Sequence, residues 1–320
     1  MTLRQRLGLC ALAFPLVLFA CRERKNETPP AQAPPAATPP AAAPKEAEAK
    51  PASYTYPAPV KGHYQEVNVG SFDLVDGIAY PAAKGAGTVV YLTSKLIASP
   101  VLAGSPCPMT QARALTQLRN AQYVEVPVGV TGKASYFAAG NAFGGSSREQ
   151  EVGGHYWSAK AKQDAGRLSG TIIYKPHGTI QFELPISTPK VAEVGQADFA
   201  DGHRGAEGAS APTEQEVTAA YTAIRNAALQ KDVRLLLAAQ GFDAMQIASI
   251  RGLAGIDDDL AVYADRFLEP GAAGEFTAKG GVAYVRSEGA NSKGKKFANY
   301  YWFAPCQSHL VLVSIAENPQ

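Results

Sequence analysis

The residue types best suited to chemistry gather in the last quarter of the sequence. Asp257, Asp258 and Asp259 form the densest group of carboxylates. Such a group can bind a cation or, if one member is buried, supply a general base. More often, consecutive acidic residues cap the start of a helix and interact with the positive end of its dipole. We favour this second interpretation.

Aromatic residues of a later segment complete a hypothetical pocket. Side chains alternate between the two faces of a strand, so Tyr300 and Trp302 share one face and Tyr301 takes the other. An enzyme would need a carboxylate, Asp259 or Asp265, to point into a cavity beside this aromatic pair. The alternative, which we favour, is that the rings pack in the core.

Familiar catalytic and metal-binding motifs do not accompany these residues. The sequence contains no P-loop, no dinucleotide-binding glycine motif after a strand, no nucleophile elbow and no His-Glu-x-x-His. The glycine-rich stretch from Gly140 to Ser147 lacks the closing Lys-Ser/Thr of a phosphate loop. His203 near Asp198 and Asp201 is interpreted as part of a solvated hinge, because flexible loops pre-organise metal ligands poorly. The sequence therefore predicts neither a cofactor nor a metal site.

The N-terminus has the organisation of a signal peptide. Arg4 and Arg6 precede an apolar run from Leu7 to Ala20, which is too short to span a bilayer as a stable helix. The run ends in Leu18-Phe19-Ala20-Cys21, which resembles the lipobox of bacterial lipoproteins. The resemblance implies removal of residues 1–20, diacylglycerol on the Cys21 sulfur, and acylation of the new amino group, with palmitate as the expected chain. Phe19 departs from the family pattern, and an ordinary secretory signal with an incidental cysteine is the alternative.

A tether follows the modified cysteine. Residues 21–58 are rich in proline and alanine, a composition that favours disordered, extended chain. At about 3.1 Å per residue, this segment reaches at most roughly 110 Å. Arg22 stands where lipoproteins of the inner membrane often carry Asp, so the family pattern implies an outer-membrane anchor facing the periplasm.

The cysteine count leaves one candidate disulfide. Cys10 leaves with the signal peptide and Cys21 carries lipid, so Cys107 and Cys306 remain. Exported proteins fold in an oxidising compartment, where two thiols can pair. We hypothesise a Cys107–Cys306 disulfide between the two predicted domains. The alternative is two separate buried thiols.

Two folded regions are predicted after the tether. Residues 59–188 contain short segments of strand pattern separated by turns, with one helix, which predicts an all-β sandwich or barrel-like domain. This region looks like a β-rich module of other bacterial envelope proteins to which we attach no function. Residues 189–211 form a polar, glycine-rich linker. Residues 212–320 begin with a capping box at Thr213 and Glu216, and helices then precede a four-strand meander, which is α+β order.

The last region resembles the NTF2-like superfamily. The resemblance rests on Ala219-Ala220-Tyr221 through Leu229-Gln230-Lys231-Asp232, on Gly281-Val282-Ala283-Tyr284-Val285, and on the closing strands. It implies a cone-shaped fold with a pocket between sheet and helices, which in this superfamily serves enzymes, binders and interaction modules.

These features predict a non-catalytic binding or structural module of the cell envelope. The partner would be the membrane, through the lipid, and an envelope protein or peptidoglycan. The formal net charge of +2 gives no reason to expect nucleic acid. The alternative is an enzyme or a small-ligand carrier that uses the NTF2-like pocket.

Overall fold

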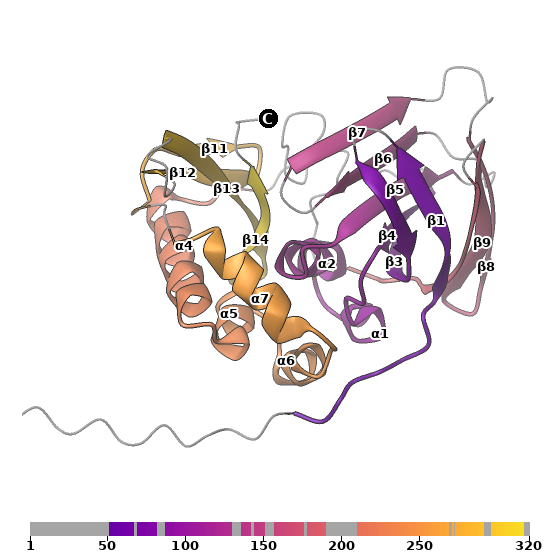
Figure 1. The fold of residues 1–320 in the computed structure, drawn as a ribbon, viewed down its shortest axis with the longest axis horizontal. Helices are drawn as coiled ribbons and strands as arrows, with labels where there is room; N and C mark the ends of the chain where they lie inside the picture. The colour runs from indigo at the N-terminus through magenta and orange to yellow at the C-terminus, as the bar shows by residue number, and fades with distance from the viewer. Residues whose placement is uncertain are drawn as a thin grey trace, which may run out of the picture. The chain divides into compact units, whose positions relative to one another are not determined.

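A computed structural model describes residues 51–66, 69–81, 87–129, 136–141, 144–150, 157–175, 178–189, 210–268, 271, 273–290 and 296–316. Cys21, the signal peptide, most of the tether and most of the predicted linker lie outside these residues. Contacts group Ala49–Gln320 into one compact unit (Figure 1). The described chain is mostly antiparallel β structure with several helices, as the coarse prediction expected. The division into two domains stays a prediction.

Two five-stranded antiparallel sheets form the N-terminal half, by which we mean the described residues of 51–189. The first sheet has the order β2-β1-β10-β9-β8 and the second has the order β3-β4-β5-β6-β7. The strands of the first sheet are β1 (Val60–Glu66), β2 (Gly70–Leu74), β8 (Trp157–Asp164), β9 (Arg167–Tyr174) and β10 (Gly178–Pro185). Those of the second are β3 (Asp76–Pro81), β4 (Thr88–Thr93), β5 (Gln122–Val128), β6 (Tyr136–Asn141) and β7 (Gly144–Gln150).

The two sheets share a hydrophobic core. In β10 every second residue is buried, and Ile180, Phe182 and Leu184 join a cluster with Val90 and Val124 of the second sheet. A parallel bridge between Ala79 and Ile186 links β3 to the chain just after β10. Alternation with period two therefore places one face of each sheet in a common interior.

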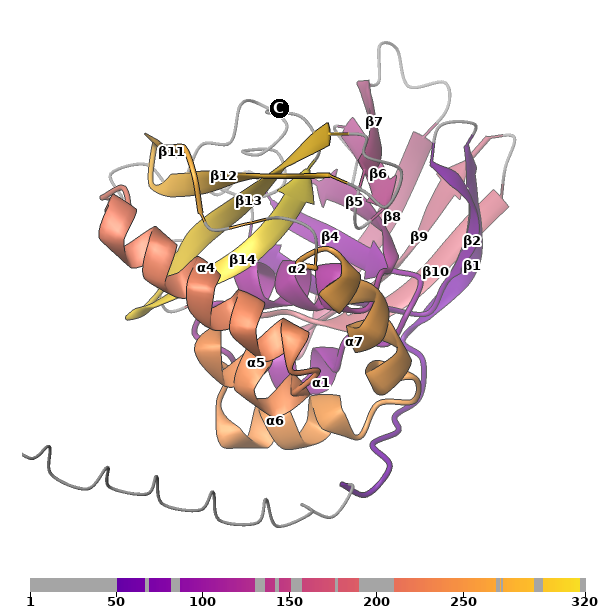
Figure 2. The same ribbon diagram turned by 60° about the vertical axis from the view of Figure 1, so that its left-hand side comes forward.

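Two helices cover the other face of the second sheet. They are α1 (Ser99–Leu102) and α2 (Pro108–Leu118), and every residue of α2 is buried. A proline at the start of α2 suits the first turn, where its missing N–H has no helical partner to lose. A helix buried on all sides must have protein on all sides, and α2 lies between the second sheet and β14 in Figures 1 and 2.

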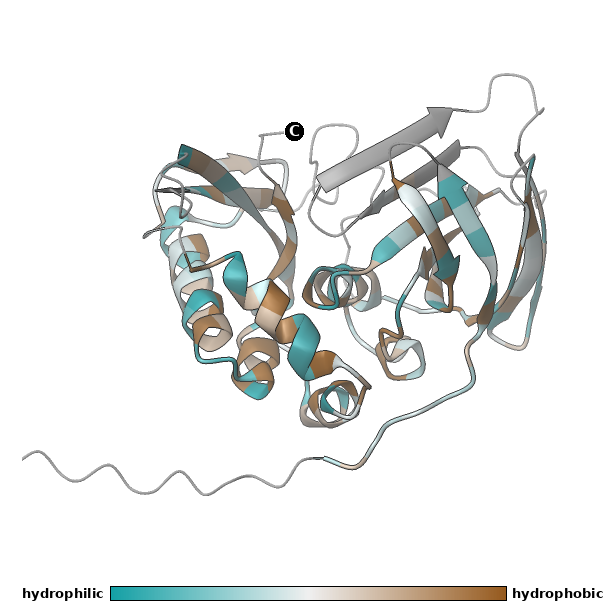
Figure 3. Cartoon of the chain, viewed as in Figure 1, coloured by the Kyte–Doolittle hydropathy of each residue, from teal (hydrophilic) through white to brown (hydrophobic). Residues whose placement is uncertain are grey.

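Helices precede strands in the C-terminal half, by which we mean the described residues of 210–316. The elements are α4 (Glu214–Leu229), α5 (Val233–Ala239), α6 (Ala244–Arg251), α7 (Ile256–Asp265), β11 (Phe276–Lys279), β12 (Val282–Ala290), β13 (Lys296–Cys306) and β14 (His309–Ala316). The predicted capping box is confirmed, since Thr213 and Glu216 exchange both bonds. Hydrophobic and hydrophilic positions alternate along α4 and α7, as in amphipathic helices (Figure 3). The sheet is a meander in the order β11-β12-β13-β14.

One hydrophobic cluster runs through both halves. It contains Ile78 and Tyr91 of the second sheet, Leu115 of α2, and Val311 of β14. Gly241, after α5, has φ 76° and approaches β14 so closely that a Cβ atom there would lie 2.8 Å from the His309 ring. The surface between the two halves is thus packed as core.

Candidate functional site at the junction of the halves

Aromatic rings occupy the space between the C-terminal sheet and its helices. Tyr301 lies 4.9 Å from Tyr221 and 5.2 Å from Phe267, and Phe267 lies 5.3 Å from Tyr263, measured between ring centroids. The Tyr301 hydroxyl donates to the Arg266 carbonyl at 2.6 Å. Burial raises the pKa of Tyr301 and of Tyr263. Here, where the resemblance implies a pocket, the described residues form a packed aromatic cluster.

The residues of the hypothetical pocket lie in different contact groups. Tyr300 and Trp302 occupy the face of the sheet opposite Tyr301 and pack edge-on or tilted against Tyr284, at 5.3 and 4.5 Å between ring centroids. Asp265 is exposed at the end of α7. Asp259 is buried in the first turn of α7 and pairs with cations of the N-terminal half. The predicted capping is wrong, since α7 follows Gly255 without a side-chain cap and the three carboxylates lie in its first turn. Asp259 instead pairs with cations across the junction.

A buried ion network at Asp259 joins the halves. Lys95 Nζ lies 2.6 Å from one carboxylate oxygen of Asp259, and Arg119 Nε lies 3.1 Å from the other. Lys95 also donates to the Arg119 carbonyl, and the Arg119 guanidinium donates to the Ala254 carbonyl. Burial lowers the pKa of Arg119, and the nearby Asp259 carboxylate opposes this effect. Residues after β4 and α2 are thereby fixed to the start of α7.

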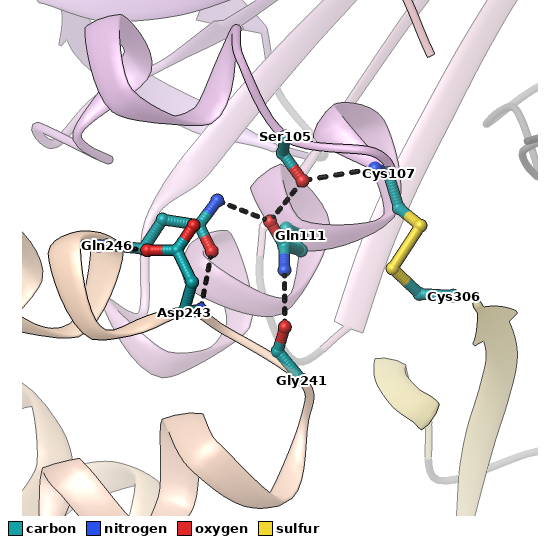
Figure 4. Close-up of a disulfide and its surroundings, with 7 residues drawn as sticks. All are labelled: Ser105, Cys107, Gln111, Gly241, Asp243, Gln246 and Cys306. Carbon is teal, nitrogen blue, oxygen red and sulfur yellow. Dashed lines mark hydrogen bonds between the residues drawn. A yellow bond between two sulfur atoms is a disulfide. The ribbon is translucent and has the colours of Figure 1, made fainter. Parts of the chain in front are cut away.

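A disulfide crosses the same junction. Cys107, before α2, is bonded to Cys306 at the end of β13, with a Cα–Cα distance of 5.8 Å (Figure 4). These are the two cysteines that the count had left for a bridge. The bond closes a loop across a sequence separation of 199 residues, and both cysteines are buried. The two halves are therefore joined covalently.

A group of amide side chains lies to one side of the disulfide and is linked to Cys107 through Ser105 (Figure 4). The Gln111 side-chain oxygen accepts bonds from the Ser105 hydroxyl at 2.6 Å and from the Gln246 amide at 2.9 Å. The Gln111 amide donates to the Gly241 carbonyl at 3.4 Å. Gln111 belongs to α2, whereas Gln246 and Gly241 belong to the C-terminal half, so neutral hydrogen bonds reinforce the covalent link.

A buried carboxylate ties the end of the tether to the fold. Asp76 accepts hydrogen bonds from the Tyr56 and Ser99 hydroxyls and from the Ile97 and Gly77 backbone amides. Burial raises the pKa of Asp76, and the four donors act in the opposite direction.

The segment that carries Tyr56 also contacts the C-terminal half. Tyr54 donates its backbone N–H to the Gly252 carbonyl at 2.9 Å. A Cβ atom at Gly252 would lie 2.7 Å from the Tyr54 Cβ, so only glycine allows this approach without a shift. Tyr54 and Tyr56, near the end of the predicted tether, are thus hydrogen-bonded to the folded body.

Beside this segment lies a cleft of about 610 Å³. Its lining includes Tyr56, Lys61, Arg167, Gln181 and Glu183, together with several prolines. The volume is in the range of small-ligand sites. The cleft opens at the edge of the outward face of the first sheet, because Lys61 and Gln181 point to that face.

An exposed hydrogen-bonded chain lies on the same sheet. His63 Nδ1 is 2.8 Å from Asp73 Oδ1, and His63 Nε2 is 2.8 Å from Ser71 Oγ. This is the bonding order of a Ser-His-Asp triad. The side chain of Asp73 is 81% exposed and that of His63 is 46% exposed, so water competes for both bonds and weakens the interaction that would orient and charge the imidazole. We therefore interpret the chain as part of a polar surface.

Sequence reasoning missed most of these residues. Asp76, Lys95, Arg119 and Gln111 are single polar residues inside apolar or mixed segments, and their partners lie far away along the chain. Only the Asp259 carboxylate and the two cysteines carried a local signal.

Comparisons with known proteins add no relative. No family model, no curated protein and no solved structure matches the chain. Within the described ranges, no helix is long and apolar enough to cross a membrane, and His, Cys, Asp and Glu side chains form no group of three that could hold a metal ion.

Proposed function

We propose that this chain is a lipid-anchored protein of the cell envelope whose folded body is a non-catalytic binding or structural module. The observation that carries the proposal is the junction, where a disulfide and the Lys95–Asp259–Arg119 network hold two halves together. Structural disulfides are typical of exported proteins. The lipobox-like Cys21 and the following tether supply the anchor and the distance from it.

The finer fold is also part of the proposal. We assign the C-terminal half to the NTF2-like superfamily on its order of helices followed by a four-strand meander. Four aromatic rings fill the space between its sheet and helices, which favours a packed interaction module over the alternative of an enzyme or ligand carrier using that space.

The experiment compares the wild-type protein with Cys21→Ser in fractionated cells. The wild type is expected in the outer-membrane fraction, labelled by a palmitate analogue, and the variant in the soluble periplasmic fraction without label. Pull-down from solubilised envelope would then identify the partner, with the variant as the unanchored control. Cytoplasmic accumulation of the wild type, or equal labelling of both forms, would refute the proposal.

A further inference from the structure

The outward face of the first sheet is polar and uncovered in the described structure. On each strand the residues that alternate with the core are exposed or half-buried. The helices drawn in Figures 1 and 2 all lie beyond the second sheet, away from this face. We call this surface the polar face; its members are Lys61, His63, Gln65, Ser71, Asp73, Ser158, Lys160, Lys162, Asp164, Arg167, Ser169, Thr171, Ile173, Thr179, Gln181 and Glu183, and only Ile173 among them is apolar.

Cations remain on the polar face after its ion pairs are counted. Arg167 Nε lies 2.8 Å from Glu183 Oε1, and His63 is bonded to Asp73. Lys61, Lys160 and Lys162 are exposed and form no ion pair with any residue that the structure describes. Lys61, Lys160, Lys162 and Arg167 stand against the carboxylates of Asp73, Asp164 and Glu183, so the face carries a small excess of positive charge, concentrated at these lysines without an ion pair among the described residues.

The strand register places Lys61 and Lys160 at the two ends of one row across the sheet, and Lys162 lies in the neighbouring row opposite Ser169. Lys160 lies opposite Thr171, Thr171 opposite Gln181, and Gln181 opposite Lys61. Three strand spacings separate the two lysines at its ends, which is about 14 Å. The Thr171 hydroxyl and the Gln181 amide stand between them as hydrogen-bond donors and acceptors. Lys61 and Gln181 also line the cleft, so the row continues into it.

We propose that the polar face binds peptidoglycan, whose stem peptides carry free carboxylates and whose glycan strands carry hydroxyl groups. A row of this length needs an extended ligand whose carboxylates reach separate lysines, and hydroxyl groups of a glycan match the Thr and Gln side chains between them. This inference rests on the proposed function, which places the protein in the cell envelope. The tether favours a partner away from the bilayer, because it can hold the body up to roughly 110 Å from its lipid.

The test is sedimentation of the full mature chain, made unlipidated by Cys21→Ser, with protein-free peptidoglycan sacculi. Saturable binding that weakens with added salt is expected. Reversing two charges in Lys160→Glu/Lys162→Glu should weaken binding by about tenfold or more, and the neutral pair Lys160→Gln/Lys162→Gln should have a smaller effect in the same direction. Lys296→Glu, at an exposed lysine of the C-terminal sheet, is the control for a charge reversal away from the polar face and should change binding less than about twofold.

Three results would overturn the inference. They are no sedimentation of the parent chain, an equal loss in the Lys296→Glu control, and binding to lipopolysaccharide micelles or to an acidic protein in place of sacculi. Because the purified chain carries no lipid, failure here leaves localisation untouched, whereas failure of the proposed function would appear in the cell fractionation.

Discussion

Two arginine–glutamate pairs in the N-terminal half have similar geometry and opposite surroundings. Arg113 and Glu125 lie 3.0 Å apart, with side chains only 4% and 1% exposed. Arg167 and Glu183 lie 2.8 Å apart, with side chains 50% and 64% exposed. Water and salt screen the second pair but not the first. The comparison teaches that burial, more than distance, separates charges that hold the fold from charges available to a partner.

The largest expected effect on stability is that of removing the buried Cys107–Cys306 disulfide. Replacing both cysteines in Cys107→Ser/Cys306→Ser should lower the free energy of unfolding by about 5 kcal/mol, because the unfolded chain loses a constraint across a separation of 199 residues. Urea denaturation of the oxidised wild type and the variant measures the difference. Equal midpoints, with the wild type verified as oxidised, would show that the bond does not restrain the junction.

The next effect compares the two ion pairs directly. Arg113→Met should cost about 3 to 5 kcal/mol, because the Glu125 carboxylate stays buried but loses the cation that donates to its Oε2 atom. Arg167→Met should cost less than about 1 kcal/mol. Adding Glu125→Gln to Arg113→Met should recover part of the loss. If the two single variants unfold at the same urea concentration, burial does not separate the pairs.

The buried carboxyl group of Asp76 should make the stability of the folded protein depend on pH. Burial holds its folded-state pKa above the ordinary value of 3.8, so the folded protein binds this proton more tightly than the unfolded chain does. Relative to Asp76→Asn, the wild type should therefore be most stable below pH 3.8 and lose stability as pH rises through the folded-state pKa. Denaturation curves at a series of pH values measure this, and a difference independent of pH would contradict it.

The smallest effect contrasts two neighbouring tyrosines of β13. Tyr301→Phe should cost about 1 to 2 kcal/mol, because the buried Arg266 carbonyl loses its donor. Tyr300→Phe, at a half-buried position on the opposite face, should cost less. Thermal denaturation of the two variants ranks their losses of stability. A larger loss for Tyr300→Phe would mean that the more important interior lies on the face of the sheet that carries Tyr300.

Local pattern made part of this fold predictable. The capping box at Thr213 and Glu216 and the alternation along β10 depend on neighbours in the chain, and both appear as expected. The packed contact between the halves does not depend on chain neighbours, because it pairs residues such as Gln111 and Gln246 that lie 135 positions apart. Asp259 shows both sides of this limit. Its place in a helix start followed from the sequence, whereas its partners Lys95 and Arg119 required the tertiary fold.

Intact-mass spectrometry of the protein extracted from the membrane fraction tests the central claim most directly. The account predicts a chain that begins at Cys21 and carries the mass of a diacylglyceryl group and a further acyl chain. It also predicts no alkylated thiol before reduction and two after reduction, at Cys107 and Cys306. An unmodified Cys21, or two thiols alkylated without reduction, would contradict an exported, lipid-anchored body joined across its junction.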